Sequence, residues 1–180
     1  NPQREFKMVY GCEFDVSNNH LDIVYNADDR SLKEASYVIF DLETTGLSKE
    51  FDRIIEFGGL KLVNGMVVDR LQMFLNPKQK LSEFISNMTN ITQTMVDEAK
   101  EEKDVIETWR TFIGDSVLVA HNASFDSGFI NQAMIRNGYE ALSNPVIDTL
   151  DLAKALIESK RSYRLGAIAK HYKLNYDENV

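Results

Sequence analysis

The sequence predicts an α/β fold with a mixed β-sheet, in which three antiparallel strands are followed by parallel strands and helices flank the sheet. The antiparallel part rests on a hairpin signal. Residues 54–63 and 66–75 are apolar, strand-like runs joined by Asn64-Gly65, and Asn-Gly favours the type I′ turn of a two-residue hairpin. A further β-rich run over residues 37–40 precedes them, which makes three antiparallel strands.

The parallel part of the sheet rests on a strand–helix–strand pattern further along the chain. A short buried strand is expected over residues 117–120, a helix over 124–137 ending near Gly138, and another short strand at 146–147. Strands separated by a helix pair in parallel, so the complete sheet is mixed. Other helices are expected over residues 101–112, 149–159 and 163–172, with short helical pieces between 82 and 99.

The segment before the first long strand has a different character. Residues 1–26 resemble a strand, a turn and a strand, and the polar residues 27–35 resemble a linker. We therefore expect three parts: an N-terminal segment at 1–26, a linker at 27–35 and the main domain at 36–180.

Composition excludes several classes of protein. The chain has 180 residues and a net charge of −8, with 28 acidic and 20 basic side chains. No apolar run is long enough for a membrane helix, so no membrane association is expected. The lone cysteine, Cys12, excludes an internal disulfide and a cysteine-based zinc site and fits a cytoplasmic protein. The acidic balance argues against a protein that coats DNA, but not against an enzyme that reaches nucleic acid through bound cations.

Two carboxylates follow the first strand of the predicted sheet. Asp41 and Glu43 are two residues apart, which in a strand places both side chains on one face. Such a pair is unfavourable unless it is protonated or bound to a cation. Taken alone, the pair also fits a solvated strand end.

A third acid comes after the strand at 117–120. Asp126 is expected in the first turn of the next helix, where its charge would also complement the helix dipole, and Ser124 is a candidate N-cap. Two strand ends therefore deliver three acids. Oxygen ligands without cysteine favour Mg²⁺ or Mn²⁺, and such clusters suit phosphoryl chemistry with two metal ions.

These residues resemble a known family. The run VIFDLETTGL at 38–47, followed by HNASFD at 121–126, is similar to the first two motifs of the DEDD (DnaQ-like) 3′→5′ exonucleases, and IIEFGG at 54–59 and IDTL at 147–150 also match. The resemblance covers residues 36–174 and implies an RNase H-like fold. The family usually has Gly where this chain has Asn90, a residue that tolerates positive φ.

The resemblance also implies roles for individual residues. Asp41, Glu43 and Asp126 correspond to the catalytic, metal-binding acids. Residues expected near the substrate strand are Thr44, Thr45, Leu47, His121, Asn122 and Phe125, with Leu47 as a wedge against the terminal base. Leu47 and Phe125 also fit core packing. Asp148 is expected to support the site at most, since it also fits an N-cap.

The N-terminal segment indicates which group within the family the chain resembles. FKMVYGCE at 6–13 and IVYN at 23–26 are similar to the end of a PHP domain that continues into the exonuclease of PolC-type replicative polymerases. This implies a proofreading exonuclease whose partners are a single-stranded DNA 3′ end and the rest of a polymerase chain. Glu13 is then a candidate PHP residue, although an exposed strand residue fits it as well.

The family's third motif, His-x4-Asp or Tyr-x3-Asp, is not found. His171 and Asp177 have the wrong spacing, and His20 lies in the N-terminal segment. Either the motif follows Val180 in a longer chain, or it has been lost and the domain is a non-catalytic insert. An RNA-trimming enzyme on the same fold is a further alternative. If the motif is missing from this piece, the 180 residues alone should have little nuclease activity.

Overall fold

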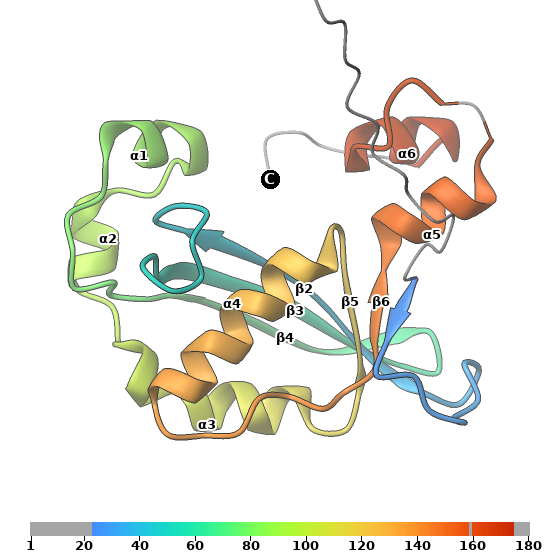
Figure 1. The fold of residues 1–180 in the computed structure, drawn as a ribbon, viewed down its shortest axis with the longest axis horizontal. Coiled ribbons are helices and arrows are strands. Elements are labelled where there is room, and N and C mark those ends of the chain that lie inside the picture. The colour runs from blue at the N-terminus through green and yellow to red at the C-terminus, as the bar shows by residue number, and fades with distance from the viewer. Residues whose placement is uncertain (1–22, 159, 175–180) are drawn as a thin grey trace, which may run out of the picture.

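The computed structural model describes residues 23–158 and 160–174. The expected strand at residues 6–10, together with Cys12, Glu13, His20 and Asp177, lies outside the described residues. Within them, one six-stranded sheet has the strand order β1-β6-β5-β2-β3-β4 (Figure 1). Its strands are β1 (Val24–Tyr25), β2 (Ser36–Thr44), β3 (Ile54–Val63), β4 (Met66–Phe74), β5 (Val117–Ala120) and β6 (Val146–Asp148).

The antiparallel half of the sheet is confirmed. Strands β2, β3 and β4 pair antiparallel in sequence, with Ser36 opposite Val63 and Leu60 opposite Arg70. Asn64 and Gly65 both have positive φ, as a type I′ turn requires. Strand β2 is longer than the apolar run suggested, because it continues through the two acids to Thr44.

The parallel half is confirmed as well. Strand β5 pairs in parallel with β2 and with β6, so β2 is the strand at which the two halves meet. At the far edge, β1 pairs antiparallel with β6, with Val24 opposite Ile147. The last residues of the predicted N-terminal segment therefore contribute a strand to this sheet, while the division of the chain into three parts stays a prediction.

Six helices surround the sheet in the part of the chain that the structure describes. They are α1 (Glu83–Thr89), α2 (Gln93–Asp97), α3 (Glu102–Ile113), α4 (Ala123–Arg136), α5 (Thr149–Leu156) and α6 (Leu165–His171). Helices α3 and α4 pack on one face of the sheet, whereas α5 and α6 follow β6 on its edge (Figure 1). Among the described residues, no helix has both the length and the apolar character needed to cross a membrane.

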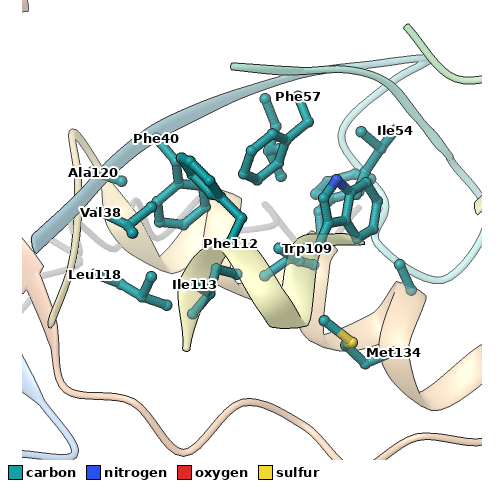
Figure 2. Close-up of a cluster of buried hydrophobic side chains, with 14 of the residues drawn as sticks. Val38, Phe40, Ile54, Phe57, Trp109, Phe112, Ile113, Leu118, Ala120 and Met134 are labelled. Carbon is teal, nitrogen blue, oxygen red and sulfur yellow. The ribbon is translucent and has the colours of Figure 1, made fainter. Parts of the chain in front are cut away.

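Strand β2 divides its side chains between two faces. Val38, Phe40 and Leu42 are buried, while Asp41 and Glu43 alternate with them and point to the other face. The buried set joins the main core, in which Phe57 contacts Trp109 at 5.6 Å between ring centroids. Figure 2 shows this cluster between the sheet and the helices. The packing of Val38, Phe40 and Leu42 in the core thus fixes the position of β2 and the face to which both acids point.

A smaller cluster lies under α1 and α2, where Ile55, Leu81 and Ile85 are buried together. Asn90 ends α1 in the left-handed conformation, with φ of 59°. The substitution of Asn for the family's Gly is therefore accommodated at a position that needs positive φ, as expected.

Candidate active site

Two acids of the candidate site project from β2, and a third carboxylate faces them. Glu56 lies directly opposite Glu43 in the antiparallel register of β2 and β3. Its side chain accepts a hydrogen bond of 2.8 Å from Gln72 on β4. The open face of the sheet therefore holds Asp41, Glu43 and Glu56 on two neighbouring strands.

Asp126 reaches the same place from α4. Its side chain is only 3% exposed, and its Oδ1 accepts a 3.1 Å hydrogen bond from the backbone N–H of Leu42. Leu42 lies between the two β2 acids, so this single bond fixes Asp126 beside both of them. The structure therefore brings together the three acids that the sequence analysis singled out.

The pKa values of all three acids are raised, because burial and neighbouring negative charge both disfavour the ionised forms. Burial, followed by the negative charge of Asp41, raises the pKa of Asp126 to about 7, although the hydrogen bond from the Leu42 N–H acts in the opposite direction. Burial and the charge of Asp41 likewise raise the pKa of Glu43 to about 7. The pKa of Asp41 is raised by burial and by Glu56. Each acid thus carries an unfavourable negative charge that a nearby cation would neutralise.

The residues fit a divalent cation by their chemistry. All three donors are carboxylates, the oxygen ligands that Mg²⁺ and Mn²⁺ prefer. Within residues 23–158 and 160–174, no group of three or more His, Cys, Asp or Glu side chains is arranged as a ready-made metal site. What the fold provides is the concentration of negative charge at one end of β2.

Helix α4 is held in place at its N-terminus by a residue of the next strand. Asp148 accepts hydrogen bonds from the backbone N–H groups of Asn122 (3.1 Å) and Ala123 (2.9 Å). Asn122 is the N-cap residue, with φ of 65°, and makes no side-chain cap bond. The prediction that Ser124 is the N-cap was therefore wrong, since Ser124 lies inside α4. The Asp148 carboxylate of β6 accepts the hydrogen bonds of the first backbone N–H groups instead.

Asp148 also caps its own helix, as the sequence analysis expected. It accepts hydrogen bonds from the backbone N–H groups of Leu150 (2.8 Å) and Asp151 (3.4 Å) at the start of α5. The side chain is 2% exposed. The Asp148 carboxylate consequently caps the starts of both α4 and α5. Only the cap of α5, the helix that follows it directly, could be predicted from the residue spacing.

The loop between β2 and β3 is shaped by internal hydrogen bonds. The Thr44 hydroxyl donates to the Gly46 carbonyl at 2.6 Å. The Thr45 hydroxyl donates to Asp52 at 3.0 Å and accepts from the side chain of Gln79 at 2.6 Å. A Cβ at Gly46 would lie 2.5 Å from a carboxylate oxygen of Asp52, so a larger residue there would require the Asp52 side chain to shift. Both threonine hydroxyls are therefore committed to the loop.

Leu47 stands at the tip of this loop and is 87% exposed. The alternative that it packs on the core was wrong. Phe125 is partly buried against Phe129, at 4.9 Å between ring centroids. A cavity of 520 Å³ lies between the loop and α4, and its lining includes Leu47, Asn122 and Phe125. Three of the predicted substrate-binding residues thus line one hollow, and one of them, Phe125, precedes Asp126 in the chain.

His121 links the end of β5 to the start of α5. Its Nδ1 lies 3.0 Å from the Thr149 hydroxyl, which in turn donates to the Ala120 carbonyl at 3.2 Å. His121 is close enough to Asp41 to lower the pKa of that acid. The histidine side chain is therefore held at the junction of β5 and α5.

Three residues that support the site were not singled out from the sequence. Glu56 lay in a matched motif without an assigned role, and the pairing of β3 with β2 sets it opposite Glu43. Asp52 and Gln79 hold Thr45 through contacts that span 7 and 34 residues. Because these contacts depend on loop geometry, residue spacing carried no signal for them.

Comparison with known proteins identifies the family to which this chain belongs. The sequence profile of the exonuclease family matches residues 38–179, which contain both acidic motifs. The chain belongs to the exonuclease family. It is 46% identical over 165 residues to the PolC-type DNA polymerase III of Oceanobacillus iheyensis, and 42% identical over 173 residues to that of Latilactobacillus sakei.

These alignments cover 92% and 96% of this chain but only 12% of each polymerase. The exonuclease chain therefore spans about an eighth of the length of the relatives that it matches. Its resemblance is to one region of those polymerases.

Solved structures agree with the exonuclease fold. The structure of exonuclease X in complex with 5′-overhanging duplex DNA superimposes with a TM-score of 0.61 and 28% identity, covering 78% of this chain and 75% of that one. Escherichia coli exonuclease I in complex with a dT13 oligonucleotide gives a TM-score of 0.69 at 18% identity, covering 79% of this chain and 37% of that one. The expected RNase H-like architecture is thereby confirmed.

Divalent cations should stabilise this exonuclease chain, and more so at alkaline pH. At about pH 8 Glu43 and Asp126 are ionised and repel Asp41, whereas at about pH 5 protons occupy the two carboxylates with raised pKa and compete with the cation. Thermal unfolding with MgCl₂ or MnCl₂ should show a higher Tm, with a larger increase at about pH 8. NaCl at equal ionic strength is the control, and an equal effect of all three salts would contradict the prediction.

Proposed function

We propose that the chain is a 3′→5′ DNA exonuclease domain that proofreads for a PolC-type replicative polymerase in the cytoplasm. The observation that carries the proposal is the meeting of Asp41, Glu43 and Asp126 at the end of β2, with Asp126 fixed by the Leu42 N–H. The relatives named above are polymerases, which supports a place within a longer polymerase chain.

Asp41, Glu43 and Asp126 would hold two Mg²⁺ or Mn²⁺ ions. When bound, such ions activate water and stabilise the leaving 3′ oxygen of the scissile phosphodiester. The role of the protein is to position the three carboxylates. Strand β2 fixes two of them, and the Asp148 bonds to the start of α4 fix the third. Asp41, Glu43 and Asp126 thus form a site set by secondary structure rather than by mobile loops.

The single-stranded 3′ end would enter the 520 Å³ cavity lined by the start of α4, the helix that carries Asp126. Leu47 is free to contact the terminal base, since it is 87% exposed. Phe125 and Asn122 line the same hollow, and His121 is held nearby through Thr149. Thr44 and Thr45 act by shaping the loop, because their hydroxyls already have partners in it. The general base of the reaction is expected in the third motif.

The test is nucleotide release from single-stranded DNA by the full-length protein with Mg²⁺ or Mn²⁺. We expect release of nucleotides from the 3′ end, and its loss in Asp41→Ala. DNA and RNA oligonucleotides of one sequence are compared, because an RNA-trimming enzyme would depend on the 2′-hydroxyl. Absence of release by the wild type, or release unaffected by Asp41→Ala, would favour a non-catalytic insert and overturn the proposal.

A further inference from the structure

The loop that carries Leu47 also carries a lysine with no assigned role. Among the residues that line the 520 Å³ cavity, Lys49 is the one cation and Glu50 the one anion. In the part of the chain that the structure describes, Lys49 forms no ion pair, unlike Lys78, which binds Glu101 at 2.8 Å. An unpaired ammonium group therefore stands at the candidate site of a protein whose net charge is −8.

The backbone of Lys49 is anchored. Its carbonyl accepts a 2.8 Å hydrogen bond from the guanidinium of Arg136, near the end of α4. That guanidinium also donates to both oxygens of Glu102 on α3, at 2.8 and 3.1 Å. The Arg136 and Glu102 side chains are 18% and 10% exposed. Two helices thus hold the loop at Lys49.

The side chain of Lys49 packs on α4 at Gly128, where the helix has no Cβ. A Cβ added to Gly128 would lie 3.4 Å from Cδ of Lys49 and 3.8 Å from its Nζ. The ammonium group consequently lies close to the helix surface, next to Ser124 and Ser127. It borders a second hollow of 280 Å³ that includes these two serines and Asn131. Lys49 is therefore shared by two adjoining hollows on neighbouring faces of α4.

We propose that Lys49 binds a backbone phosphate of the single strand on the 5′ side of the scissile bond, an inference that rests on the proposed function. None of the three acids lines either hollow, so the phosphate at Lys49 is not the one at the acids. A strand with a free 3′ hydroxyl has no phosphate beyond the scissile one on its 3′ side. Any other phosphate that the lysine contacts therefore belongs to an upstream nucleotide.

The experiment compares a long and a minimal substrate in the full-length protein. For single-stranded DNA, Lys49→Gln should raise KM about fivefold at unchanged kcat, and the slope of log KM against log salt should fall by about 0.7, the value for one phosphate contact. Thymidine 5′-p-nitrophenyl phosphate has no upstream phosphate, so its hydrolysis should not change. Lys49→Arg should retain most of the affinity.

Lys33→Gln is the matched control, since this exposed lysine lies before β2, at the end of the strand away from the acids. Lys33→Gln should leave KM and kcat for both substrates unchanged. An equal effect of Lys49→Gln on both substrates, or an unchanged KM and salt slope for DNA, would overturn the inference.

A binding measurement separates this inference from the proposed function. In the Asp41→Ala background, fluorescence anisotropy of a labelled oligothymidylate reports affinity without turnover. Lys49→Gln should weaken that binding about fivefold. If the wild type releases no nucleotide while the lysine still contributes to binding, the exonuclease proposal fails and the phosphate site stands; unchanged binding refutes the phosphate site.

Discussion

Replacing Asp126 with Asn should reduce nucleotide release about 10³-fold or more while making the metal-free protein more stable at about pH 8. Asn keeps an oxygen that accepts the 3.1 Å hydrogen bond from the Leu42 N–H, so the start of α4 stays in place. It removes the charge that binds cations, and a 10³-fold loss corresponds to about 4 kcal/mol of transition-state stabilisation.

The gain in stability follows from the pKa of Asp126. The folded protein raises this pKa to about 7, mainly through burial, above the ordinary aspartate value of 3.8. The stability that the protonated group supplies is complete below the ordinary value and is lost as the pH rises through the raised one. Asn avoids that loss. Its Tm should therefore exceed that of the wild type at about pH 8, and the difference should vanish at about pH 4.

The measurements are nucleotide release by the full-length protein and thermal unfolding of the 180-residue chain without divalent metal. Asp126→Ala is the matched control, since it removes the charge and also the acceptor for the Leu42 N–H. It should lose both activity and stability. Activity of Asp126→Asn within tenfold of the wild type would show that the acid does not belong to the active site.

Replacing Asp148 with Ala should destabilise the chain by about 3 kcal/mol, because four backbone N–H groups lose their acceptor in a site that is 2% exposed. For a chain of this size, the Tm should decrease by roughly 6–12 °C. Nucleotide release should decrease as well, since the start of α4 positions Asp126. Thermal unfolding and the exonuclease assay measure the two effects.

Asp151→Ala is the control for this substitution. Asp151 lies in the first turn of α5 and pairs at 2.7 Å with Lys154, in a surface ion pair whose loss costs less than about 1 kcal/mol. If Asp148→Ala unfolds no earlier than Asp151→Ala, then the four hydrogen bonds contribute nothing measurable, and another feature must hold the start of α4.

The sequence was informative where local patterns decide structure. The Asn64-Gly65 turn specified the hairpin, and strand alternation predicted that Asp41 and Glu43 share one face. Both are properties of residues close together in the chain. The convergence of Asp126 with them required the parallel pairing of β2 and β5, which the strand–helix–strand pattern also suggested.

What the sequence did not reveal depends on contacts between distant segments. Ser124 resembled an N-cap by its position, yet Asp148, 25 residues away from Ala123, supplies the cap. Leu47 could have packed on the core, but the hydrogen bonds of Asp52 give the loop a shape that leaves it exposed. For Ser124 the hydrogen-bond acceptor comes from another strand, and for Leu47 it comes from the far side of the same loop. Residue spacing alone indicates neither contact.

The bond between Leu42 and Asp126 joins residues 84 positions apart. Such a contact has a high entropic cost of loop closure and forms only once the centre of the sheet has assembled. The candidate site therefore has no local stability of its own. Partial unfolding that separates β2 from β5 also separates Asp126 from the two acids of β2. A chain that is incompletely folded, during synthesis or after damage, consequently holds no assembled acid cluster, so the proposed exonuclease activity would appear and disappear together with the cooperative core.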